Sequence, residues 1–160
     1  MSIAADAPAW LVGILLILLA IAAIEDAWRL RISNLIVLGV AASGITAMVW
    51  TGLGWKAWQP LLMAVAILAV GTPMFAAGWI GGGDIKLLAA NLLWFTLDGG
   101  WKMLVAVAVA GGILTVLTLI LRFFRRSGPD EKIAIFRRGI SIPYGIAVAS
   151  GVAATILWSR

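Results

Sequence analysis

The chain has 160 residues, of which 63% are hydrophobic and only 12% are charged. A soluble domain usually carries about 25% charged residues, so this composition excludes an ordinary soluble protein and predicts a surface that mostly faces lipid. The net charge is +5, but the basic residues lie in short segments between apolar blocks, where membrane orientation explains them better than nucleic-acid binding does.

The apolar blocks predict an all-α, polytopic membrane protein with one domain over residues 1–160. A spanning helix needs roughly 20 apolar residues to cross about 30 Å of hydrocarbon. Six such helices are expected, at about 8–25, 35–53, 61–80, 85–97, 103–121 and 140–158. Nine tryptophans all fall near a predicted helix end, and indole rings prefer the headgroup level. The tryptophans therefore support these limits as depth markers.

The fourth predicted helix, residues 85–97, is short for a full crossing because its 13 residues span about 20 Å. We expect it to cross nevertheless, with its start sunk below the cytoplasmic surface. Irregular backbone at that depth is tolerated only where it is buried in protein or lines a wet cavity. The three glycines at residues 81–83 therefore predict a cavity.

The distribution of basic residues predicts the orientation. Loops one, three and five hold nine of the twelve, namely Arg29, Arg31, Lys86, Arg122, Arg125, Arg126, Lys132, Arg137 and Arg138. The other side holds Lys56, Lys102 and Arg160. The positive-inside rule then places these three loops in the cytoplasm and both termini outside.

The fifth loop, residues 122–139, allows two interpretations. Pro129 suits the first turn of a helix, and Ile133 and Phe136 follow one helical turn apart. The segment is therefore either a short helix on the membrane surface or a solvated basic loop. The sequence does not decide between them.

Two aspartates are candidates for chemistry, because ionisable residues at membrane depth are costly. The chain has no cysteine and no histidine, which excludes thiol nucleophiles, histidine bases and zinc sites. Asp26 follows one crossing and Asp84 follows three, so both face the cytoplasmic side. Converging carboxyl groups can share a proton, one acting as base on a water and the other as acid on a carbonyl.

Each aspartate also has a purely structural interpretation. Asp84 directly precedes a predicted helix, where aspartate is a favoured N-cap. Asp26 lies close to Arg29 and Arg31 at a membrane exit, where a surface ion pair is the usual outcome. Glu25 is equally able to be an interfacial charge. Taken singly, these residues do not identify an enzyme.

The motifs become specific when they are combined. Gly81-Gly82-Gly83-Asp84 is a GxGD element followed by Ile85-Lys86-Leu87, Asp26 begins a segment that ends at Ile32-Ser33-Asn34, and Ile142-Pro143-Tyr144-Gly145 opens the last helix. This combination resembles the type IV prepilin peptidase family of GxGD membrane proteases over nearly the whole chain, about residues 10–158. It is most similar to the short form associated with tight-adherence (Flp-type) pili.

The resemblance implies that Asp26 and Asp84 are the catalytic pair of an aspartic endopeptidase. It implies a prepilin substrate whose short basic leader is removed after a glycine, near the cytoplasmic face of a bacterial inner membrane. Gly81, Gly82, Gly83 and Lys86 are the expected substrate contacts, since backbone without side chains can approach an extended strand closely. Membrane lipids and the pilus assembly machinery are the other expected partners, and no cofactor or metal is implied.

The sequence departs from the family pattern in two ways. Ser33 stands where the family usually has a proline, which predicts a looser start of the second helix. Longer members carry an N-terminal cytoplasmic region, often with cysteine pairs, that is linked to N-methylation of the pilin. The resemblance therefore implies a peptidase without the methyltransferase or an S-adenosylmethionine site.

Two rival hypotheses come from other functional classes. A small transporter or ion-pathway protein also combines Gly-broken helices with buried carboxylates, although no internal repeat supports it here. The second rival hypothesis is a non-catalytic partner in a secretion assembly. Cleavage of a prepilin by the purified protein distinguishes the enzyme from both.

Overall fold

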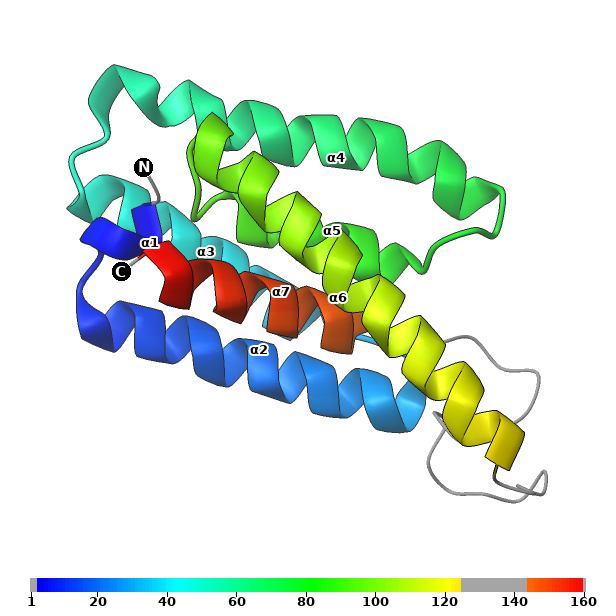
Figure 1. Cartoon of the computed structure of the whole chain (residues 1–160). Helices are drawn as coiled ribbons and strands as arrows, with labels where there is room; N and C mark the ends of the chain where they lie inside the picture. The colour runs from blue at the N-terminus through cyan, green and yellow to red at the C-terminus, as the bar shows by residue number, and fades with distance from the viewer. Residues whose placement is uncertain (1–2, 125–143, 160) are drawn as a thin grey trace.

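The computed structural model describes residues 3–124 and 144–159 (Figure 1). Every regular element in these two ranges is a helix, which confirms the all-α prediction for the described residues. The elements are α1 (Ile3–Asp6), α2 (Ala9–Arg29), α3 (Asn34–Trp50), the 3₁₀-helix η1 (Gly54–Ala57), α4 (Trp58–Ala76), α5 (Gly82–Leu92), α6 (Leu97–Phe124) and α7 (Tyr144–Ser159). The two interpretations of the segment around Pro129 lie outside the described residues.

The apolar surface of the bundle fits a membrane protein. Three stretches in the described part are long and apolar enough to cross a membrane, namely Ala9–Arg29, Gly54–Ala76 and Leu97–Leu121, and α3 and α7 are shorter apolar helices. Large apolar side chains point outward, such as Leu35 and Val49, which are 79% and 77% exposed. Soluble proteins rarely expose extensive apolar patches. The number of crossings, six, stays a prediction.

The helix α5 lies in the middle of the bundle, where it contacts α3, α4 and α7 (Figure 1). Its Leu87 and Leu92 side chains are fully buried, as are Trp94 and Phe95 just after it. The Trp94 indole N–H donates a hydrogen bond to the Val40 carbonyl of α3 at 3.4 Å. The prediction that Trp94 marks a membrane interface is therefore wrong, because this indole belongs to the core. The other eight tryptophans are exposed.

The short helix α1 extends the core where α5 ends. Ile3 and Ala4 are buried, and the Ala4 N–H donates to the Trp94 carbonyl at 3.2 Å. The helix α5 has only 11 residues, so it does not reach this end of the bundle by itself. The sequence alone does not predict α1, because its four residues are too few to show helical periodicity.

Several helix boundaries differ from the predicted ones, among them those of α5 and α6. The helix α6 begins at Leu97 rather than near residue 103, and the i, i+4 ion pair of Asp98 and Lys102 at 2.8 Å lies within its first turns. The helix α5 begins at Gly82 and ends at Leu92, earlier than the expected 85–97. Two of the three glycines therefore belong to the helix, and the irregular segment precedes them.

The α6–α7 contact depends on a close approach at Gly151. A Cβ atom at this position would lie 2.6 Å from the backbone N and Cα of Val107 on α6. Backbone atoms cannot rotate away from an added methyl group as a side chain can, so Gly151→Ala forces α6 and α7 apart. Overpacking of this kind costs about 1–3 kcal/mol, and we expect a lower unfolding temperature in detergent. Gly112→Ala is the control, because a Cβ there meets nothing within 4 Å; equal stability of both variants would contradict the close approach.

Candidate active site

Asp26 lies in the last turn of α2 and is buried, with 5% of its surface exposed. Its Oδ2 accepts a hydrogen bond of 2.6 Å from the backbone N–H of Gly145, in the first turn of α7. A Cβ atom at Gly145 would lie 2.9 Å from that same oxygen. The absence of a side chain at Gly145 is therefore what allows the start of α7 to hold the Asp26 carboxyl group.

Asp84 is the third residue of α5, whose N-cap is Gly81. The expectation that Asp84 is itself the N-cap is therefore wrong. Its carboxyl group accepts a hydrogen bond from the backbone of Gly81, an arrangement in which the third helical residue reaches back to the cap. A Cβ atom at Gly81 would lie 2.6 Å from Asp84 Oδ2, so a glycine is needed here for the carboxyl group to approach.

The structure brings the two carboxyl groups together. Asp26 and Asp84 both line a cavity of about 580 Å³ and a neighbouring one of about 260 Å³, and their charges interact. Two carboxyl groups that share a cavity disfavour double ionisation and can hold one proton between them. The remaining residues of the larger cavity are Leu30, Gly78, Trp79, Ile80, Gly81, Thr115 and Tyr144. Those of the smaller cavity are Leu30, Arg31, Ile32, Gly81, Gly82 and Gly83.

The glycine stretch serves the protein's own packing as well as the cavity wall. A Cβ atom at Gly82 would lie 3.2 Å from the Phe75 ring of α4, and one at Gly83 would lie 3.3 Å from the Cβ of Ile32. These contacts allow the start of α5 to sit between α4 and the segment after α2. All three glycines also line the smaller cavity.

Two hydrogen bonds connect the motifs around the site. Lys86 Nζ donates to Asn34 Oδ1 at 3.3 Å, which joins the GxGD element to the segment that begins at Asp26. Lys86 lines neither aspartate cavity, so the structure does not bring it together with the two carboxyl groups, and its contact with substrate stays a prediction. Glu25 Oε2 accepts from the Ser33 N–H at 2.9 Å.

Ser33 strengthens the start of α3, contrary to the expectation of a looser one. It is the N-cap of the helix, and its Oγ accepts from the Leu35 N–H at 3.3 Å. Proline has no backbone N–H and could not make the hydrogen bond to Glu25. Glu25 therefore has a structural role beside the candidate site.

Three residues of the site were not identified from the sequence. Leu30 lines both cavities and is the only non-glycine residue in the described part with positive φ, at 51°. Such outliers are costly and cluster at functional sites. Tyr144 lines the larger cavity and Gly145 holds Asp26. The sequence signal for both Tyr144 and Gly145 is the motif Ile142-Pro143-Tyr144-Gly145.

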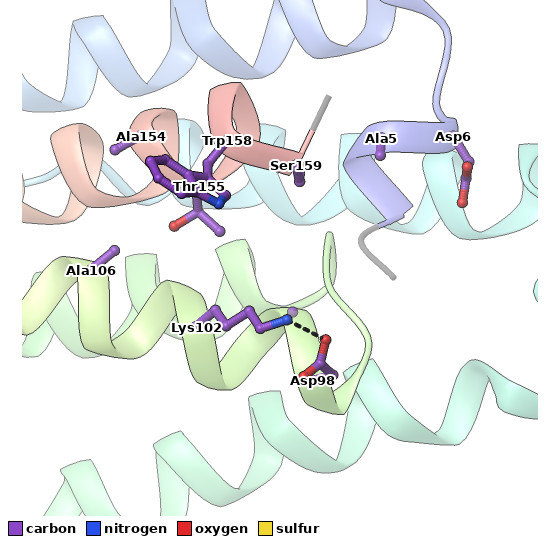
Figure 2. A pocket seen from close by; sticks show the side chains of 10 residues that line it. Ala5, Asp6, Asp98, Lys102, Ala106, Ala154, Thr155, Trp158 and Ser159 are labelled. Atoms are coloured by element: carbon purple, nitrogen blue, oxygen red, sulfur yellow. Dashed lines mark hydrogen bonds and ion pairs between the residues drawn. The ribbon is translucent and has the colours of Figure 1, made fainter.

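A further cavity, of about 700 Å³, lies elsewhere, between α1, α6 and α7 (Figure 2). Figure 2 shows the Lys102 ammonium directed toward Asp98, with Asp6 apart from them. The Asp98–Lys102 pair is more than 60% exposed, and exposed pairs contribute little. This cavity therefore lacks the buried, converging carboxyl groups of the Asp26–Asp84 site. No group of three potential metal ligands occurs among the described residues.

The fold and this site define a helical membrane protein with paired carboxyl groups in a shared cavity. Comparison with protein families matches residues 13–120, about two thirds of the chain, to the type IV leader peptidase family. The chain belongs to this family and is a peptidase, which confirms the resemblance noted in the motifs. The matched range includes Asp26 and Asp84 but not Tyr144. No curated protein and no solved structure matches the chain.

Proposed function

We propose that this protein is an aspartic endopeptidase that removes the short basic leader of Flp-type prepilins, with Asp26 and Asp84 as its catalytic pair. The observation that carries the proposal is the convergence of both carboxyl groups on the same two cavities. The two residues are 58 positions apart and come from different helices. Family membership supplies the substrate class.

The proposed reaction needs only water and the two carboxyl groups. The ionised carboxylate takes a proton from a water, whose oxygen attacks the scissile carbonyl carbon, while the protonated partner donates to the carbonyl oxygen. When the tetrahedral intermediate collapses, the C–N bond breaks and the leaving nitrogen takes a proton from a carboxyl group. The leader ends in a new carboxyl group and the mature pilin begins with an amine.

The linings of the two cavities fit an extended peptide that runs past the two aspartates. The smaller cavity has three glycines in its wall, which suits the small residue that precedes the cut. The larger one, walled by Trp79, Ile80 and Tyr144, has room for a large apolar side chain on the other side of the bond.

The test is cleavage by the purified protein in liposomes. An Flp-type prepilin is added, and both products are identified by mass spectrometry. We expect one cut after a glycine of the leader and a mature N-terminus without an added methyl group, since we propose a peptidase without methyltransferase activity. An intact prepilin in the presence of folded protein would refute the proposed function.

We also propose a cytoplasmic site in a bacterial inner membrane, with six crossings and both termini outside. The support is the nine-to-three distribution of basic residues. A reporter that is active only outside the cytoplasm should signal when fused after Gly54 or Thr96 and stay silent when fused after Ser127. The in-frame fusions are compared at equal abundance, and a signal from the Ser127 fusion contradicts this topology.

A further inference from the structure

Tyr144 is a phenol in the cavity of the two aspartates. It is the first residue of α7, is half-buried, and lines the larger cavity together with Asp26 and Asp84. The phenol group and the two carboxyl groups therefore border the same space.

Two contacts fix the position of Tyr144. On one side its ring lies against Gly111 of α6, where a Cβ atom would be 2.7 Å from Cε2 and 3.0 Å from the hydroxyl oxygen. On the other side, the next residue is Gly145, whose N–H binds Asp26. The phenol and the Asp26 carboxyl group are therefore held by the same turn of backbone.

Two hydroxyl groups line this cavity, those of Thr115 and Tyr144, and they differ in whether they form a hydrogen bond. Thr115 Oγ1 donates to the Gly111 carbonyl within α6 at 2.7 Å, so its proton is engaged. The Tyr144 hydroxyl forms no hydrogen bond with any of the residues 3–124 and 144–159. A phenol in partly apolar surroundings usually finds an acceptor, and the free space around it is the cavity.

We propose that the Tyr144 hydroxyl donates a hydrogen bond to the carbonyl oxygen of the scissile peptide. The inference rests on the proposed function. When water attacks the carbonyl carbon, the electron pair of the C=O double bond moves to oxygen, and the phenol stabilises that charge without giving up its proton. A donor aimed at a developing oxyanion acts in the transition state more than in the bound substrate.

Tyr144→Phe tests the hydroxyl while retaining the ring that packs on Gly111. We expect kcat to fall about 100-fold, the usual loss when one oxyanion donor is removed, with KM nearly unchanged. The control is Thr118→Val, whose hydroxyl donates to the Leu114 carbonyl of the same helix and which should keep wild-type kcat. Unchanged kcat in Tyr144→Phe overturns the inference.

A substrate change tests the contact directly. A prepilin peptide with a thioamide at the scissile bond offers a weaker acceptor in place of the carbonyl oxygen. We compare the cleavage rate of the normal peptide with that of the thioamide peptide. The ratio of the two rates should be smaller for Tyr144→Phe than for the wild type, because the variant lacks the hydroxyl whose hydrogen bond the thioamide weakens. Equal ratios mean that Tyr144 does not contact this oxygen.

A second pair of variants keeps the hydroxyl group and tests whether its position matters. Gly111→Ala places a methyl group against the Tyr144 ring, whereas Gly112→Ala places one where nothing lies within 4 Å. We expect a lower kcat for Gly111→Ala alone, and equal rates for both count against the inference. Asp26→Asn and Asp84→Asn are assayed alongside. If these are inactive while Tyr144→Phe is fully active, only the role of Tyr144 is wrong; if they are active, the proposed function is wrong.

Discussion

Replacing Asp26 or Asp84 with asparagine should abolish prepilin cleavage while the protein remains folded in the membrane. Asparagine has nearly the same shape, and its carbonyl oxygen can still accept from Gly145 at position 26 or from the Gly81 backbone at position 84. It cannot accept a proton from water or hold the shared one. Loss of one member of a catalytic unit typically costs about 10⁴-fold or more, so cleavage in co-expressing cells should be undetectable.

The control for these variants is Glu25→Gln, next to Asp26 in the chain. Glu25 accepts from the Ser33 N–H, a contact that glutamine can keep, and it lines neither aspartate cavity. We expect near wild-type cleavage from this variant. If either Asp→Asn variant also cleaves at that rate, at equal abundance, the two-carboxylate assignment is wrong.

Gly145→Ala should reduce cleavage strongly without removing any functional group. The added Cβ would lie 2.9 Å from Asp26 Oδ2 and 3.1 Å from Asp26 Cγ, closer than real Cβ contacts normally are. The carboxyl group must therefore move and lengthen its 2.6 Å hydrogen bond to the Gly145 N–H. A misplacement of about 1 Å in a catalytic group can cost about 100-fold, which is the loss expected in kcat.

The matched control for Gly145→Ala is Gly13→Ala, on the same helix as Asp26. A Cβ at Gly13 meets nothing within 4 Å, and alanine favours a helix over glycine by roughly 0.5–1 kcal/mol. This variant should cleave normally and be at least as stable as wild type. Normal kcat in a folded Gly145→Ala protein would show that the start of α7 does not position Asp26.

Much of the framework could be predicted from the sequence because membrane helices follow a simple rule. Long apolar blocks indicate helices, and each predicted segment has a helix in the described residues. The odd number of crossings before Asp26 and before Asp84 placed both at one end of the bundle. The structure has them lining shared cavities, although their chemical roles remain a proposal.

The contacts that shape the site could not be predicted, because they join distant residues through backbone geometry. The Gly145 N–H donates a hydrogen bond to Asp26, which lies 119 positions earlier in the sequence, and no local sequence pattern predicts that contact. The place of Trp94 near a predicted helix end indicates the membrane interface. In the structure α5 is short and ends at Leu92, and the Trp94 side chain that follows it is buried in the core. The hydrogen bond of Lys86 to Asn34 joins residues 52 positions apart, and the expected substrate contact of Lys86 stays a prediction.

The meeting of Asp26 and Asp84 in one site can be measured directly in membranes, because the chain contains no cysteine. The double variant Asp26→Cys/Asp84→Cys is treated with a short bifunctional thiol reagent that fluoresces only when both arms have reacted. We predict a fluorescent, intramolecular bridge between positions 26 and 84. The control pairs Asp26→Cys with Asp98→Cys, since Asp98 lines the cavity at the other end of the bundle, and it should give none. If both cysteines at 26 and 84 react with a single-armed reagent yet form no more bridge than the control, the two aspartates do not share a site.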